Sequence, residues 1–386
     1  MGFPYVTIDS DAHVVEPPDL WTRYMDRKWG DRIPQQLVPG SVPMRIDNEV
    51  VPPNGYLSSP IGATVNPKYR KAKELGFGAR SHLNSMDEEG IDMSVLFPTA
   101  GLIVMGASKA GADLMSAAAS AYNNWLSDMC SEGEDRLHGV GMLDLRDIKA
   151  ACAEAIRCVD KHRFVGFFVR PNPVDGKQFY DPKYEPLWSV LEELQVPICF
   201  HEGALVALPQ IGPDRFGDKI NLWHMATHVM ENQLAMVSMV LGGVCERHPK
   251  LRCGFMECGA GWLPYWMWRM DEHAETALRV SGKEVNLPLT PTEYVKRQCY
   301  VSADTEEYPA IHAMDVMAGR NVLWASDYPH ADAKYPKALR TVSKLPGIEQ
   351  HLERVLSVTP LEFFGKSLRD AAGKVLARRN APAQAT

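Results

Sequence analysis

Short apolar runs alternate with longer amphipathic stretches along most of the chain. About eight of these runs are rich in Val, Ile and Phe and have the length of buried strands, namely Tyr5–Ile8, Met93–Phe97, Leu137–Leu143, Val165–Arg170, Val196–Phe200, Arg252–Met256, Tyr300–Ser302 and Asn321–Trp324. The stretches between them predict helices, most clearly over Ala107–Glu132, Leu145–Lys161, Pro186–Gln195, Thr227–Glu246 and Thr292–Arg297. Eight buried strands in alternation with helices predict a closed (β/α)8 TIM barrel with the helices outside.

The first connection departs from this alternation. Residues 17–80 hold many Pro, Gly and Asn residues with little periodicity. We therefore predict an insertion after the first strand that serves as a lid, a substrate wall or an oligomer contact. Residues 1–375 are predicted to form one barrel domain, and residues 376–386 a flexible polar tail.

Composition narrows the class of protein. A formal net charge of -7, without a cluster of Lys and Arg, argues against a nucleic-acid partner. The start of the chain lacks the features of a signal peptide, and no run of about 18 apolar residues occurs, so we expect no membrane association and a cytoplasmic location. The eight cysteines are scattered without a CxxC pair and are predicted to be reduced core residues. No Gly-rich phosphate loop is present, and we expect a small-molecule substrate and a homo-oligomer.

Metal-capable side chains fall at the ends of the predicted strands. Asp11 and His13 follow the first strand, His201 ends VPICFH, Glu257 ends RCGFME, and Asp327 follows NVLWAS. The carboxyl ends of barrel strands meet on one face, so these residues are expected to converge there. Imidazole and carboxylate groups bind Zn, Fe or Mn and leave positions open for water and substrate. The sequence thus predicts a site for one or two divalent metal ions.

Each of these residues also has a purely structural interpretation. A D-x-H pair is common, although two residues at this spacing on an extended chain point to the same side. His201 could be a core histidine bonded to a backbone carbonyl, and Asp327 could cap a following turn. Glu257 carries more weight, because a carboxylate directly after CGFM is costly to bury without a cation or a hydrogen-bond partner. Gly259 and Gly261 would allow a tight turn that directs it into the barrel mouth.

Further candidates lie near these positions. His224 and His228 are four residues apart, so they share a helical face if WHMATHVMEN is a helix; otherwise they flank a loop. With Glu257 as a bridge they could hold a second metal ion. His330 is a candidate for a supporting or substrate-binding role. In the aromatic run GWLPYWMWRM core packing is the favoured interpretation, and only Trp262 is expected to contact substrate.

The segments IDSDAHVVEP, MDEEGIDMSVLFPT, GVCERHPKLRCGFMECGAGWLPYW, MDEH and LWASDYPH together resemble the amidohydrolase-related (amidohydrolase 2) family. Its members include non-oxidative decarboxylases similar to aminocarboxymuconate-semialdehyde decarboxylase, lactonases and hydratases. The resemblance covers nearly the whole chain and implies a (β/α)8 fold with a metal held by Asp11, His13, His201 and Asp327. Many members have His-x-His where this chain has Asp-x-His, which makes the site harder and more anionic. Glu257 stands where similar decarboxylases carry a catalytic histidine.

Three functional interpretations follow. The leading one is a metal-dependent hydrolase, in which metal-activated water attacks an amide, ester, lactone or thioester of a small organic acid or natural product. Asp327 or Glu257 would take the proton, with His228 as a further catalytic candidate. The alternative is a non-oxidative metal-dependent decarboxylase in which Glu257 replaces the usual histidine. A non-catalytic metal-binding barrel is the third, and the number of convergent ligand-type residues argues against it.

Overall fold

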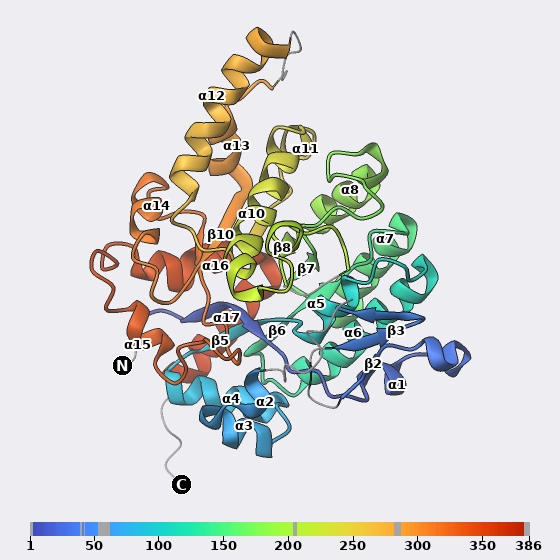
Figure 1. Cartoon of the computed structure of the whole chain (residues 1–386). Helices are drawn as coiled ribbons and strands as arrows, with labels where there is room; N and C mark the ends of the chain where they lie inside the picture. Colours follow the sequence, from blue (N-terminus) through green and yellow to red (C-terminus); the bar gives the residue numbers. More distant parts are fainter. Residues whose placement is uncertain are drawn as a thin grey trace.

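The computed structural model describes residues 3–38, 41, 43–52, 62–203, 207–281 and 287–381. Eight parallel strands pair in the order β1-β5-β6-β7-β8-β9-β10-β11. They cover Ile8–His13, Met93–Phe97, Leu137–Met142, Gly166–Val169, Ile198–His201, Cys253–Met256, Cys299–Ala303 and Val322–Trp324 in that order. Nearly all their residues are buried, as expected for strands enclosed by helices. The predicted (β/α)8 barrel is confirmed (Figure 1).

Backbone hydrogen bonds beyond the end of β11 complete the ring. Asp327 N donates to Asp11 O at 3.1 Å, and His13 N donates to Tyr328 O at 2.6 Å. Ser326 adds its N–H and its hydroxyl to the carboxylate of Asp9. The barrel is therefore closed at its carboxyl end, where the predicted metal ligands lie.

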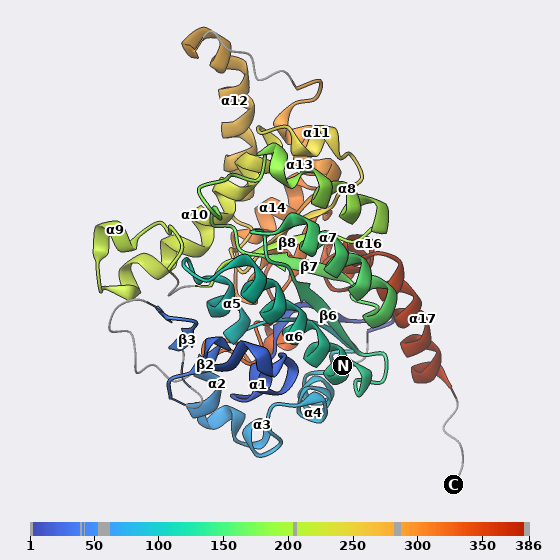
Figure 2. The same cartoon turned by 90° about the vertical axis from the view of Figure 1, so that its right-hand side faces the viewer.

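Helices surround the strands on all sides (Figures 1 and 2). The five predicted helices correspond to α6 Ala112–Ser131, α7 Ile148–Arg157, α8 Glu185–Leu194, α10 Ile220–Val240 and α13 Pro291–Gln298. Local signals fix several starts: a capping box formed by Thr290 and Glu293 begins α13, and the Asp147 carboxylate caps α7. The aromatic run after Gly261 lies at the start of α12 Leu263–Ser281, a helix that its spacing fits. Further helices that the periodicity did not predict are α4 Ala79–Glu89, α14 Ala310–Val316, α16 Thr359–Phe364 and α17 Lys366–Asn380.

Several predicted boundaries were wrong. The first strand ends at His13, not at Ile8, because its polar residues point into the closed barrel and are buried there. The helix predicted from Ala107 begins only at Ala112, since the Glu49 carboxylate binds the preceding segment. The helix predicted over Thr227–Glu246 spans Ile220–Val240 instead.

The predicted tail also starts too early. Helix α17 continues to Asn380, held by an ion pair of Arg379 with Asp92 at 3.0 Å and by one of Arg378 with Asp135. Residues 382–386 lie outside the described part of the chain.

The segment after β1 contains short elements of its own. These are α1 Leu20–Tyr24, a three-stranded antiparallel sheet of β2 Gln35–Gln36, β3 Met44–Ile46 and β4 Glu49–Val51, then α2 Gly62–Val65 and α3 Arg70–Glu74. Tyr69 Oη donates to His330 O at 2.8 Å, and Lys68 Nζ donates to Ala331 O at 3.0 Å. Part of the insertion thus lies against the loop that follows β11, at the carboxyl end of the barrel. Residues 39, 40, 42 and 53–61 of the predicted insertion lie outside the described residues.

Two further sequence expectations concern the whole chain. All eight cysteines are free, and six of them are buried, as predicted. Across the described residues, each helix is either too short or too polar to cross a lipid bilayer.

Candidate metal centre and active site

The five predicted ligand residues lie together at the carboxyl ends of β1, β8, β9 and β11. His13 Nε2 is 3.6 Å from Asp11 Oδ1 and 3.4 Å from Asp327 Oδ1. His201 Nε2 is 3.4 Å from Asp11 Oδ1 and 3.5 Å from Glu257 Oε2. The convergence predicted from their positions at strand ends is therefore present in the structure.

Second hydrogen bonds orient the two imidazoles. His13 Nδ1 donates to Pro98 O and His201 Nδ1 donates to Glu202 O, each at 2.8 Å. Since a carbonyl oxygen can only accept, each Nδ1 carries the proton and each neutral ring presents its Nε2 lone pair to the centre. Burial, followed by the nearby His330 and His201 rings, lowers the pKa of His13 and keeps it neutral.

Several buried atoms at the centre make no hydrogen bond with any residue that the structure describes. They are both carboxylate oxygens of Asp11, Nε2 of His13 and Nε2 of His201. Carboxylate oxygens and the Nε2 atoms of these tautomers are acceptors, and their close approach without a cation between them is unfavourable. Two overlapping groups that share His13 bring ligand atoms within 4.8 Å of one another: Asp11, His13 and His201, and His13, Glu257, Asp327 and His330. The residues present fit a divalent ion with mixed nitrogen and oxygen ligands, such as Mn, Fe or Zn.

Two of the carboxylates occupy strained backbone positions. Glu257 follows β9 with φ 48°, and Asp327 follows β11 with φ 58°, in the left-handed region that non-glycine residues rarely adopt. Glu257 N donates to Ser302 Oγ at 2.7 Å, which fixes this turn. Such strain costs roughly 1–3 kcal/mol and persists where the surroundings hold it. It turns both carboxylates toward the centre, where burial and the neighbouring Asp327 and Asp11 carboxylates raise the pKa of Glu257.

His330 supports Asp327. Its Nδ1 lies 2.6 Å from Asp327 Oδ1, and its Nε2 lies 3.1 Å from Thr99 Oγ1. Burial disfavours the imidazolium, but the Asp327 carboxylate outweighs this effect, so the pKa of His330 is raised. Although its position brings it within reach of the ion, its contacts suit the supporting role expected from the sequence.

His224 and His228 lie on one face of α10, with ring centroids 4.5 Å apart, so the loop interpretation of this segment was wrong. His228 Nδ1 lies 3.3 Å from His224 O, and His228 Nε2 lies 3.5 Å from Glu257 Oε1. Burial and then His224 lower the pKa of His228 to about 3, so the ring is neutral. Neither histidine belongs to a group of three potential ligands among the described residues. The geometry therefore favours a contact between His228 and Glu257 over a second metal ion.

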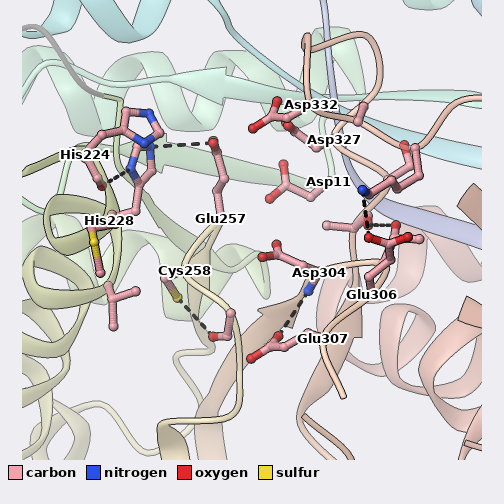
Figure 3. A pocket seen from close by; sticks show the side chains of 18 of the residues that line it. Asp11, His224, His228, Glu257, Cys258, Asp304, Glu306, Glu307, Asp327 and Asp332 are labelled. Atoms are coloured by element: carbon pink, nitrogen blue, oxygen red, sulfur yellow. Dashed lines mark hydrogen bonds and ion pairs between the residues drawn. The ribbon is translucent and has the colours of Figure 1, made fainter. Parts of the chain in front are cut away.

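A pocket of about 700 Å³ opens onto this centre (Figure 3). Trp262 lines it and donates its Nε1–H to Cys258 O and Gly259 O, each at 2.9 Å; its contact with substrate stays a prediction. Sequence reasoning missed four further carboxylates in the lining, namely Asp304, Glu306, Glu307 and Asp332. Asp304 directly follows β10, so the strand-end rule that found the other residues would also have identified it.

The chain matches a known family and several characterised relatives. The sequence model of the amidohydrolase family matches residues 8–366. A 2-amino-3-carboxymuconate-6-semialdehyde decarboxylase of Dictyostelium discoideum is 27% identical over 243 residues, which cover 63% of this chain and 65% of that protein. A gamma-resorcylate decarboxylase of Rhizobium sp. (strain MTP-10005) is 30% identical over 196 residues, which cover 50% of this chain and 58% of that protein. The matched regions thus span less than two thirds of either relative.

Solved structures with this fold extend over nearly the whole chain. An amidohydrolase from Mycobacterium avium subsp. paratuberculosis K-10 superposes with a TM-score of 0.76 at 23% identity, covering 95% of this chain and 99% of that one. A 5-carboxyvanillate decarboxylase from Novosphingobium aromaticivorans DSM 12444, complexed with manganese and 4-hydroxy-3-methoxy-5-nitrobenzoic acid, gives a TM-score of 0.69 at 19% identity. That match covers 94% of this chain and 96% of the other. At these identities the structural likeness shows the fold alone. Both curated relatives are decarboxylases, so the comparisons favour the decarboxylase alternative and do not support the hydrolase interpretation.

Proposed function

The chain belongs to the amidohydrolase family, and on this premise we propose that it is a metal-dependent, non-oxidative decarboxylase of a small aromatic or unsaturated carboxylic acid. The observation that carries the proposal is the position of Glu257. One of its oxygens faces the imidazole nitrogen of His201, and the other faces His228, which lies outside the metal groups. A carboxyl group so placed can deliver a proton beside the metal centre. The decarboxylases among the curated relatives support this reaction class.

We assign Asp11, His13, His201 and Asp327 to a single divalent ion. The assignment rests on the unpartnered buried atoms of Asp11, His13 and His201, on the hydrogen bonds that direct both imidazole lone pairs inward, and on the 3.4 Å distance between Asp327 Oδ1 and His13 Nε2. The manganese bound to the 5-carboxyvanillate decarboxylase supports Mn, and the ligand set is equally compatible with Fe or Zn. When bound, the ion would orient the oxygen atoms of the substrate and stabilise negative charge as it develops.

The protein's own residues supply the proton. As the bond to the carboxylate breaks, CO2 leaves and the bonding electron pair stays on the substrate carbon. Glu257 donates a proton to that carbon, so that one proton replaces one CO2. The neutral His228 accepts a hydrogen bond from the protonated carboxyl group and holds it in place, and solvent then reprotonates Glu257 from the open side of the pocket.

Other residues shape the site. Trp262 provides an aromatic wall against which the substrate would lie. His330 holds Asp327 through its 2.6 Å contact. The insertion supports the mouth of the pocket, because Tyr69 and Lys68 bind the backbone of the loop that follows β11.

The exposed aromatic side chains of Tyr265 and Trp268 on α12, 60% and 57% exposed, support the expected homo-oligomer. In both views α12 projects beyond the rest of the molecule (Figures 1 and 2). The cytoplasmic location stays a prediction.

A substrate panel tests the proposed reaction. The protein, loaded in turn with Mn, Zn or Fe, is incubated with 2,6-dihydroxybenzoate, with 5-carboxyvanillate and with a set of simple esters, lactones, amides and thioesters. We expect CO2 release from at least one acid, dependent on added metal and lost in His201→Ala. Hydrolysis of an ester, lactone, amide or thioester without CO2 release from any acid would contradict the proposal.

A further inference from the structure

Most of the charged side chains that line the pocket are negative. Of the described residues, seven carboxylates and one lysine line it, with no arginine. The lysine, Lys334, places its Nζ 2.7 Å from Glu306 Oε2, so its charge is already paired. The pocket therefore offers no free cation that could bind an anionic group remote from the metal.

Two other cations of this region are engaged elsewhere. Arg170 is buried and donates to the Glu202 carboxylate, to Leu102 O and to Gly203 O. Lys68 donates to the backbone carbonyls of the loop that follows β11 and does not line the pocket. The Arg170 charge is thus paired with Glu202, and the Lys68 charge acts on Asp332 and Asp327 from outside the pocket lining.

Most of the carboxylates also have a defined task. Asp11 and Asp327 are assigned to the metal ion and Glu257 to proton transfer. Glu307 accepts hydrogen bonds from Ala260 N at 2.9 Å and from Gly261 N at 2.7 Å. With Glu306 paired to Lys334, two acids remain. Neither the Asp304 nor the Asp332 carboxylate makes a hydrogen bond or ion pair with a residue that the structure describes.

The pocket has two different walls. Met225 and Val229 from α10 and Trp262 at the start of α12 form a mainly apolar wall. Asp304 and Asp332 come from the segments after β10 and β11, and Figure 3 shows their carboxylates in the same part of the pocket as those of Asp11 and Asp327. Burial, and after it the Glu307, Asp327 and Asp11 carboxylates, raise the pKa of Asp304 to about 7.

We propose that this pocket selects an acid with a protonated amine on the edge of the molecule away from the departing carboxylate, and that it rejects acids with a second anionic group. The proposal rests on the proposed function for the position of the carboxylate. A flat ligand would pack its apolar face against Trp262 and Val229. Its ammonium group would then meet Asp304 and Asp332, which make no side-chain hydrogen bond or ion pair of their own with a residue that the structure describes.

Matched ligands test this selection by binding alone. Isothermal titration of the manganese-loaded protein would compare 4-(aminomethyl)benzoate, 4-(hydroxymethyl)benzoate and terephthalate, together with their meta isomers. These ligands share a ring and a carboxylate and differ in the charge of the remote group. For the isomer that fits better, we expect the ligand with the remote ammonium group to bind at least about 10-fold more tightly than the dicarboxylate. The ligand with the remote hydroxyl group should bind with an affinity between the two.

Substitutions assign the preference to its residues. The double variant Asp304→Asn with Asp332→Asn should reduce the preference for the ammonium ligand over the dicarboxylate to less than about threefold. Asp332→Asn alone should reduce this preference in part. Asp19→Asn is the control, because it removes the same charge from an exposed residue that does not line the pocket. Equal or tighter binding of the dianion, an unchanged preference in the double variant, or no binding of any of the ligands would overturn the proposal.

The binding series and a CO2-release assay on dianionic and amine-bearing aromatic acids together separate this inference from the proposed function. If the ligands follow the predicted charge order while no acid releases CO2, the decarboxylase proposal fails and the charge selection stands. If CO2 is released as readily from dianionic acids as from amine-bearing ones, the charge selection fails and the decarboxylase proposal stands.

Discussion

Glu257 Oε1 lies 3.5 Å from His228 Nε2, a nitrogen left without a proton by the contact of His228 Nδ1 with His224 O. Two acceptors at this distance need a proton or a cation between them. The described residues offer this pair no third ligand, so a proton on Glu257 is the simpler answer. This relationship favours the proposed role of Glu257 as a proton donor over a bridge between two metal ions.

Glu257→Gln distinguishes these roles. The amide keeps the size of the side chain and can still donate a hydrogen bond to His228, but it cannot transfer a proton. We expect metal content to stay unchanged while kcat falls by about 10²–10⁴-fold. Metal analysis and steady-state kinetics on the same preparation provide the check; loss of metal would assign Glu257 to the ligand set instead.

His201→Ala should remove the metal. The ring is fully buried, and its Nε2 has no hydrogen-bond partner among the described residues. We expect about one ion per wild-type chain and a loss of metal affinity of at least about 100-fold in the variant. His312→Ala, at an exposed histidine outside the two candidate groups, is the control and should retain full metal content. Equal metal content in both variants, measured by elemental analysis, would show that the ion is held elsewhere.

The sequence was sufficient for the barrel and for most of the centre, because strand ends follow from apolar runs and all strand ends of a barrel meet on one face. The sequence did not predict the end of a strand that contains polar residues. Asp9 and Asp11 made the end of β1 look like a loop, although both are buried inside the closed barrel. The orientation of the Glu257 side chain could not be predicted either. The turn that aims Glu257 at His228 depends on a strained backbone and on Ser302, a contact across 45 residues of chain.

The strain at Glu257 predicts a conflict between stability and function. A φ of 48° disfavours any residue with a Cβ, and glycine relieves that cost. In the metal-free protein we expect Glu257→Gly to unfold with a free energy about 1 kcal/mol higher than Glu257→Ala, since both variants lack the carboxylate. Both should be inactive. Denaturant titration of the two variants would show the difference, and an alanine variant as stable as the glycine variant would argue against strain at this turn.

His82 predicts a specific dependence of stability on pH. The ring is buried under Tyr328, and burial lowers its pKa from 6.5 to about 4. Between these values the unfolded chain binds more protons than the folded one, so the free energy of unfolding should fall as the pH drops from 6.5 to 4. This group alone accounts for about 3 kcal/mol over that range. Wild type should therefore lose more stability on acidification than His82→Gln, and parallel pH profiles for the two proteins would contradict the assignment.

Decarboxylation in D2O with a carboxyl-labelled acid tests the central claim most directly. The metal-loaded protein should release one labelled CO2 for each deuterium that appears at the carbon which carried the carboxylate, and Glu257→Gln should suppress both at full metal occupancy. Hydrolysis products without labelled CO2, or CO2 release that is equally fast in Glu257→Gln, would contradict an enzyme in which Glu257 protonates the carbon beside the metal centre.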